Sequence, residues 1–263
     1  MLGEVFAKTV RDQRRAVAGW GAGIVATVAV MAALWPSVRD MFDDEMLADF
    51  PEVMQRLFDL ETMSTGSGFF NIELFSIVLP IVFIAYGIGR GSRLIAGEEQ
   101  DGTLEVVIVS PVTRSQLVVE KAAGLAVGVT ALGTALFVAI VIATAVVGMG
   151  IPTAHAAIGA MAMVLIGLQH GWLALAVGAA TGRRGLAVGV AGVAAVSGYL
   201  LHVLGALVDA VAPWQRLSPF TQATGAGPVS GDVPLGFAWL AVSSIAFVAV
   251  ALPLFERRDI ATA

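Results

Sequence analysis

The chain contains no cysteine and only two lysines among its fifteen basic residues. Without cysteine it has no disulfides, no thiolate metal ligands and no thiol nucleophile. The sequence also lacks the Gly-x-x-x-x-Gly-Lys-Ser/Thr phosphate loop, the His-Glu-x-x-His zinc motif and the Gly-x-Ser-x-Gly nucleophile turn. The chain is therefore not expected to be an enzyme, to hold a metal or to hydrolyse ATP through a phosphate loop of its own.

Charge is scarce as well. Charged residues make up 13% of the chain and hydrophobic residues 57%, which is typical of integral membrane proteins. Six apolar runs are long enough to cross a bilayer, which takes about 20 residues. The predicted spans are 17–35, 72–93, 115–147, 156–181, 185–208 and 233–255. The predicted fold is an all-α integral membrane protein with six transmembrane helices, in a single domain over residues 1–263. The first run lacks a small-residue cleavage site, so a retained helix is expected.

Lysine and arginine are distributed unevenly between the loops. Twelve of the fifteen lie at the N-terminus, around the second loop, in the fourth loop or at the C-terminus: Lys8, Arg11, Arg14, Arg15, Arg90, Arg93, Arg114, Lys121, Arg183, Arg184, Arg257 and Arg258. The other three are Arg39, Arg56 and Arg216. By the positive-inside bias, both termini and the loop between spans two and three are expected to be cytoplasmic.

Two stretches outside the spans have the spacing of amphipathic helices. Residues 2–16 carry apolar and charged side chains on different faces, which favours an interfacial helix before the chain turns into the membrane. Residues 38–62 combine an acidic surface with apolar residues every three or four positions, which predicts a helix on the outer membrane face, bent at Pro51. A solvated acidic face is favoured there over a cation site.

A charged, turn-rich insert separates the second and third spans. Gly97 and Gly102 punctuate it, and the apolar run 104–109 suits a short helix that ends at Ser110-Pro111, because proline disfavours helix at the preceding residue. Thr113 and Gln116 have the spacing of a capping box, so the third span is predicted to begin there. A short rigid helix between two spans can transmit a push.

Four polar side chains within the spans are candidates for a substrate path: Tyr86, Gln169, His170 and His202. Polar groups inside a bilayer are costly and need partners, so each is either functional or part of an interhelical hydrogen bond. The middle spans also contain three Gly-x-x-x-Gly pairs that would allow close helix contact, starting at Gly124, Gly167 and Gly185.

The insert has a recognisable pattern: Glu98-Glu99-x-x-Gly102-Thr103-Leu104-Glu105, an apolar run, then Ser110-Pro111-Val112-Thr113-Arg114. It resembles the signature of type-2 ATP-binding-cassette (ABC) permeases, and the six spans and basic N-terminus resemble the same family. Leu34-Trp35-Pro36-Ser37, Phe50-Pro51-Glu52 and Gly68-Phe69-Phe70-Asn71 further resemble permeases for antibiotic or multidrug export.

The resemblance implies a membrane subunit of an ATP-driven exporter of amphipathic drugs, antibiotics or lipids. Residues 101–109 would be a cytoplasmic coupling helix seated in a separate ATPase, and glutamates of the insert would pair with basic residues there or on the N-terminal helix. The implied coupling residues are Glu98, Glu99, Gly102, Thr103, Leu104, Glu105, Pro111 and Arg114. Two ATPase subunits holding ATP and Mg²⁺, a second copy or related permease, and membrane lipid are the implied partners, in the plasma membrane and without nucleic acid.

Other interpretations remain open. The chain could be a scaffold or sensor that recruits a cytoplasmic partner through the insert, a sodium-export permease, or an ATP-independent carrier. An intramembrane protease of the Glu-Glu-x-x-x-Arg type is disfavoured, because Thr103 stands where that motif has arginine and the glutamate pair lies outside the predicted spans.

Overall fold

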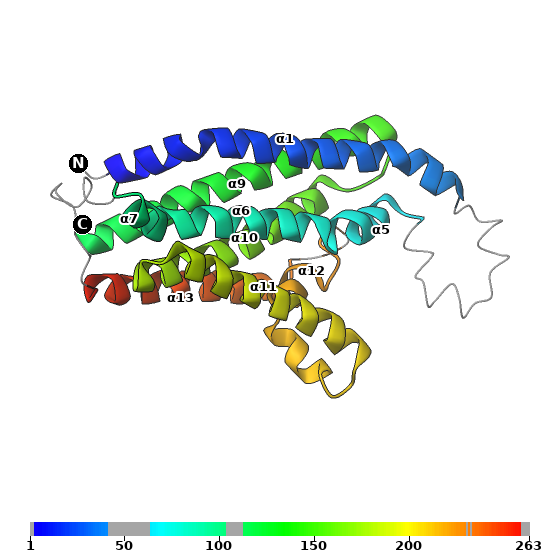
Figure 1. Ribbon diagram of the computed structural model, residues 1–263. Coiled ribbons are helices and arrows are strands. Elements are labelled where there is room, and N and C mark those ends of the chain that lie inside the picture. The colour runs from blue at the N-terminus through cyan, green and yellow to red at the C-terminus, as the bar shows by residue number, and fades with distance from the viewer. Residues whose placement is uncertain (1–2, 42–63, 104–112, 230, 232, 259–263) are drawn as a thin grey trace.

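The computed structural model describes residues 3–41, 64–103, 113–229, 231 and 233–258, and these form helices joined by short turns (Figure 1). Within these described residues, six apolar helical stretches are long enough to cross a membrane, which confirms the predicted all-α membrane class. They are α1 (Glu4–Met41), the stretch Val78–Gln100, α9 (Arg114–Val147), α10 (Thr153–Thr181), α11 (Arg184–Leu207) and α13 (Gly236–Glu256). Within the described residues no strand is formed.

The N-terminal helix and the first span are one continuous helix, so the predicted turn between residues 16 and 17 is wrong. No proline or turn motif interrupts the chain there, and α1 runs unbroken from Glu4 to Met41. Its buried stripe also continues across the predicted boundary, from Thr9 and Gln13 to Ile24 and beyond, and packs along α9. Residues 38–41 of the predicted outer helix are the end of α1, and 42–62 lie outside the described residues.

The second span is segmented. It consists, in chain order, of α5 (Gly66–Phe70), the π-helical turn η1 (Asn71–Phe75), α6 (Val78–Ser92), the π-helical turn η2 (Arg93–Gly97) and α7 (Glu98–Gln100). The break before α6 accommodates Pro80 in its first turn, where the missing N–H is tolerated. The helical path is longer at both ends than the predicted 72–93, and at its C-terminal end it leads directly to Glu98.

The third span begins where the sequence predicts. Thr113 and Gln116 form a complete capping box, with each side chain accepting a hydrogen bond from the other residue's backbone N–H. α9 then runs to Val147 and ends at Gly148, which has a left-handed conformation.

Helix α10 occupies the centre of the bundle and packs against α6, α9, α11 and α13 (Figure 1). Its contact with α6 is made by backbone. A Cβ atom added at Gly87 or Gly91 would collide with the carbonyl oxygen of Gly167 or Gly171, respectively. The Gly167 pair therefore serves close packing, as the sequence predicts.

The segment after α11 turns back on it. The 3₁₀ helix η3 (Ala212–Leu217) lies beside the end of α11, and α12 (Pro219–Thr224) returns to the bundle (Figure 1). Ser218 Oγ donates to the Gly198 carbonyl at 2.7 Å, and Gln215 Nε2 donates to the His202 carbonyl at 2.8 Å. These bonds satisfy backbone oxygens of α11 and hold the returning segment against it as a hairpin.

Candidate functional site

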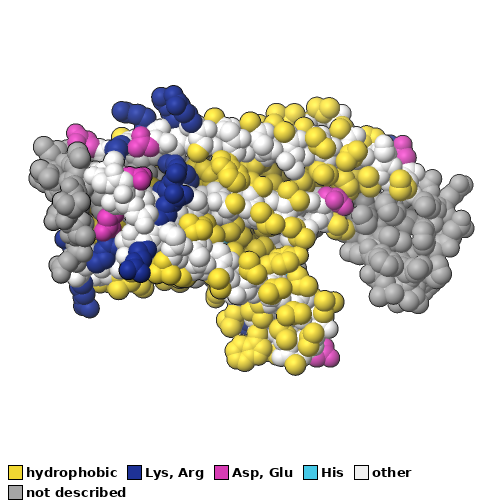
Figure 2. Space-filling view, viewed as in Figure 1, with side chains coloured by type: hydrophobic (Ala, Val, Ile, Leu, Met, Phe, Trp, Pro, Cys, Tyr) yellow, Lys and Arg dark blue, Asp and Glu magenta, His cyan; other side chains and the backbone are white. Residues whose placement is uncertain are grey.

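Both ends of the described chain and α7 lie at the same end of the bundle (Figure 1). Figure 2 shows lysine, arginine and acidic side chains gathered at this end, while the middle of the visible face is mostly hydrophobic. The grouping agrees with the predicted distribution of basic residues between the loops.

Glu98 forms an ion pair with a buried lysine at this end. Its Oε2 lies 2.6 Å from Nζ of Lys121, whose side chain is only 2% exposed. Glu98 begins α7 and Lys121 lies in the second turn of α9, so the pair joins the two helices that flank the insert. The expected partner on the N-terminal helix is thus replaced by one on α9, because Lys121 points inward from a span. Removal of Glu98 would leave the charge of Lys121 buried without a partner, which strongly destabilises the folded protein.

Glu99 pairs with Arg258, which follows α13, and both side chains are about 15% exposed. Arg114 at the start of α9 donates to backbone carbonyls at the end of α13, including Glu256 at 3.2 Å. The two arginines also lie over the ring of Phe255, at 5.9 Å and 5.7 Å from its centroid. Three predicted coupling residues, Glu98, Glu99 and Arg114, are therefore held within the protein.

The insert leaves the bundle through a capped turn. Thr103 N donates to the Glu98 carbonyl at 2.9 Å and Gly102 N donates to the Glu99 carbonyl at 3.1 Å. With Gly102 at φ +68°, this is a Schellman cap, which ends the helix and fixes its exit direction. Residues 101–103 are a turn, so the predicted coupling helix does not begin at residue 101. Leu104, Glu105 and Pro111 lie outside the described residues.

A small polar cleft of about 220 Å³ lies beside the Glu98 pair. Charged side chains of both signs line it: Asp12, Arg90, Arg93, Glu98 and Asp101, together with Thr9 and Leu94. Because the charges are mixed, the cleft has no evident preference for an anion or a cation.

The four predicted substrate-path residues are not brought together. Tyr86 donates to Gln13 Oε1 at 3.1 Å between α6 and α1, and Gln169 accepts from Ser243 Oγ at 3.1 Å between α10 and α13. Both bonds join neighbouring helices. These residues therefore act as interhelical links, the other role the sequence leaves open.

The two histidines have separate local partners. His170 is buried, with Nδ1 2.9 Å from the carbonyl of Ile166 in the preceding turn of its own helix. His202 Nδ1 lies 2.9 Å from Thr221 Oγ1, across the outer hairpin. Neither histidine lines the apolar groove described next.

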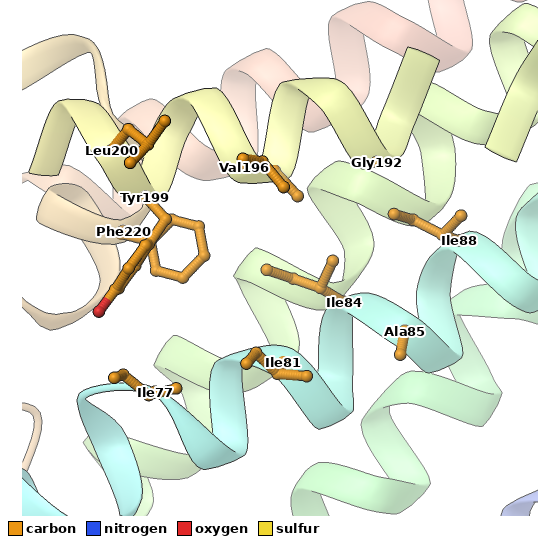
Figure 3. Close-up of a pocket in the computed structure, with 11 residues that line it drawn as sticks. Ile77, Ile81, Ile84, Ala85, Ile88, Gly192, Val196, Tyr199, Leu200 and Phe220 are labelled. Carbon is orange, nitrogen blue, oxygen red and sulfur yellow. The ribbon is translucent and has the colours of Figure 1, made fainter. Parts of the chain in front are cut away.

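An apolar groove of about 390 Å³ lies between α6 and α11 and is closed at one end by α12 (Figure 3). Its walls are Ile81, Ile84, Ala85 and Ile88 from α6 with Ile77 just before that helix, Gly192, Ala195, Val196, Tyr199 and Leu200 from α11, and Phe220 from α12. None of the four predicted path residues is among them. A search for polar groups within the spans misses such a site. The signal that could find it is the run of isoleucines three or four residues apart along one face of α6.

The chain was compared with known protein families. The family model described as multidrug efflux system permease Rv1217c, C-terminal domain, matches residues 2–256. The chain belongs to this family. The match includes all six long helices, the charged end and the apolar groove, so the predicted resemblance to multidrug efflux permeases is confirmed at this level. A comparison of the chain with curated proteins found no match.

Proposed function

We propose that the chain is the membrane-spanning permease subunit of an ATP-driven type-2 ABC exporter. The observation that carries the proposal is the placement of the Glu98 motif. It begins in the last helical turn of the second span and runs through a capped turn, it is joined to the third span by the Glu98–Lys121 ion pair, and it lies at the charged end of a multidrug efflux permease domain. ATP and Mg²⁺ would be held by a separate ATPase, and this chain would supply the path.

A push on the insert would reach two spans at once. α7 continues from α6 through η2, and Glu98 contacts Lys121 on α9. Movement of residues 104–112 by an ATPase would therefore displace the inner ends of α6 and α9 together. Since α6 also forms one wall of the groove, such a displacement would change the groove's width.

The groove would take the apolar part of an amphipathic substrate such as a drug, antibiotic or lipid-like molecule. All of its walls are apolar apart from the Tyr199 hydroxyl, and preformed apolar clefts of this size suit small ligands. Entry would be lateral, from the membrane between α6 and α11.

The charged end would face the cytoplasm, with the protein in the plasma membrane, because the positive-inside bias favours that orientation. A second copy or a related permease domain would complete the path. The poorly buried helices α1 and α11 offer apolar faces for it, and a Cβ at Gly185 or Gly189 would meet no described atom within 4 Å. Two ATPase subunits would serve the pair.

The test is purification of the chain from its native membrane in mild detergent, followed by mass spectrometry and an ATPase assay. Wild-type chain is expected to bring a stoichiometric ATPase, and Leu104→Asp to lose it. Leu235→Asp is the matched control, since Leu235 is 92% exposed at the opposite end of the bundle. A chain that copurifies with no ATPase would contradict the proposal, and an ATPase without any transport would favour a scaffold or sensor.

A further inference from the structure

The short segment after α13 contacts both ends of the insert. Arg258 forms an ion pair with Glu99, five residues before the first position outside the described range, residue 104. Arg114, two residues after the last such position, donates to the carbonyls of Phe255 at 3.3 Å, Glu256 at 3.2 Å and Arg258 at 2.6 Å. Ser115 Oγ donates to the Glu256 carboxylate. One end of one helix thus holds the chain on both sides of residues 104–112.

The contacts have a physical basis in helix ends. The last carbonyls of α13 have no partners within the helix and carry its negative dipole end, which a guanidinium group neutralises. Arg114 fills that role from α9. Phe255 lies beneath both arginines and restricts their rotation. The cluster of Glu99, Arg114, Phe255, Glu256 and Arg258 is called the clasp below.

The clasp also includes the central helix. Arg258 Nη1 donates to the carbonyl of Gly178 in the last turn of α10 at 3.3 Å. Gly182, which ends α10 at φ +66°, leaves room for this contact, because a Cβ there would lie 2.7 Å from Arg258 Nη1 and 2.9 Å from Glu99 Oε2. Arg258, which follows α13, is therefore in contact with Glu99 of α7, Arg114 of α9 and Gly178 of α10.

We propose that Arg258 and Arg114 are positioning residues for coupling. They hold both ends of the insert in a fixed position relative to α13 and α10, so that a displacement of the insert also moves these two helices. The inference rests on the proposed function, because it assigns a role within the same coupling end. The Glu98–Lys121 pair would carry the motion to α9 and the clasp would carry it to α13. Without the clasp, an ATPase could still bind the insert and hydrolyse ATP. Part of the resulting displacement of the insert would then only rotate α7 and would not move α13 and α10.

The first experiment measures transport per ATP hydrolysed, with the reconstituted permease–ATPase complex and a fluorescent amphipathic drug. Arg258→Gln is expected to lower this ratio about tenfold while the ATPase still copurifies, because a charged hydrogen-bonded contact is lost. The exchange Glu99→Arg with Arg258→Glu should restore much of it, and Arg258→Lys part of it. Arg257→Gln is the matched control, because Arg257 is the exposed neighbour. An unchanged ratio in Arg258→Gln, or an equal loss in Arg258→Gln and Arg257→Gln, would overturn the proposal.

The second experiment needs no ATPase, so it separates failure of the clasp from failure of the proposed function. Spin labels are placed on the purified chain at Gln100→Cys and Leu235→Cys, both exposed and at opposite ends of the bundle. The chain has no cysteine of its own, so only these two sites are labelled. A narrow distance distribution is expected in the wild-type background and a broad one in Arg258→Gln. Equal widths would overturn the proposal even if an ATPase copurifies.

Discussion

Helices α10 and α11 follow one another in the chain, have nearly the same mean hydropathy and each contain a Gly-x-x-x-Gly pair, yet they occupy opposite environments. In the most apolar window of α10, 67% of residues are buried within the described structure, against 17% in α11. Gly167 and Gly171 meet the backbone of α6, whereas a Cβ at Gly185 or Gly189 would meet no described atom within 4 Å. Similar apolar sequence thus serves as a fixed core in one helix and as an open face in the next.

The division assigns roles. α10 is the fixed element against which α6, α9 and α13 are set, and the clasp attaches the insert to its inner end. α11 forms one wall of the groove, and apolar side chains on the rest of its surface are exposed; under the proposed function, lipid or a second permease domain would cover them. Under the proposed function, movement of the ATPase would reach the bundle through the clasp at α10, and substrate would enter the groove beside α11.

The largest expected effect concerns buried and exposed charge at the inner end. Glu98→Gln should lower the free energy of unfolding by about 3 to 5 kcal/mol, because it leaves the buried ammonium group of Lys121 without its ion-pair partner. Arg183→Met, at the exposed start of α11, should change it by less than about 0.5 kcal/mol. Unfolding in detergent, followed by circular dichroism, measures both. Equal losses would contradict the division.

Glycine substitutions should have opposite signs in the two regions. Gly91→Ala should lower the unfolding free energy by about 1 to 3 kcal/mol, because the new methyl group collides with the Gly171 carbonyl. Gly189→Ala should raise it by up to about 1 kcal/mol, since alanine has the higher helix propensity and the site is open. The same unfolding assay applies. Changes of the same sign would show that α11 packs as tightly as α10.

The open face of α11 should matter for association. Gly189→Ile is expected to weaken pairing with a second copy about tenfold, because close helix approach needs small residues. Gly89→Ile, which adds the same side chain to an open site on α6, should leave pairing unchanged. The molecular mass of the detergent-solubilised protein over a concentration series provides the measurement. Identical dissociation curves for Gly189→Ile and wild type would exclude α11 from that interface.

The smallest effect on stability is expected in the groove. Ala85→Phe should fill the space between α6 and α11 and weaken binding of a fluorescent apolar drug about tenfold, while the unfolding free energy changes by less than about 0.5 kcal/mol. Ala157→Phe is the control, because Ala157 lines a different apolar hollow between α9 and α10. A fluorescence titration that gives both variants the same affinity would remove the groove from the proposed path.

Much of the fold could be predicted from the sequence, because length, hydropathy and capping act locally. The capping box at Thr113 and Gln116 fixed the start of the third span to within one residue. Bilayer thickness sets the length of the spans. The continuity of α1 was missed, since an amphipathic segment and an apolar one can share a helix when no residue breaks it.

The site was less predictable, because it depends on which helices are neighbours. The sequence identified Glu98 and Glu99 but not their partners: Lys121 and Arg258 lie 23 and 159 residues away, respectively. The groove has no polar signal, only isoleucines whose shared face on α6 becomes meaningful once α11 stands opposite. The polar residues within the spans are candidates because an unpaired polar group is costly there, and the structure gives them hydrogen-bond partners on other helices or within their own.

The most direct test of the central claim is transport of a fluorescent drug in inverted membrane vesicles, measured with ATP, with a non-hydrolysable ATP analogue, and with ATP plus a proton uncoupler. An ATP-driven exporter predicts drug accumulation that requires hydrolysable ATP, persists with the uncoupler and is lost in Leu104→Asp. Accumulation that proceeds without ATP and collapses with the uncoupler would contradict the account and identify an ion-driven carrier.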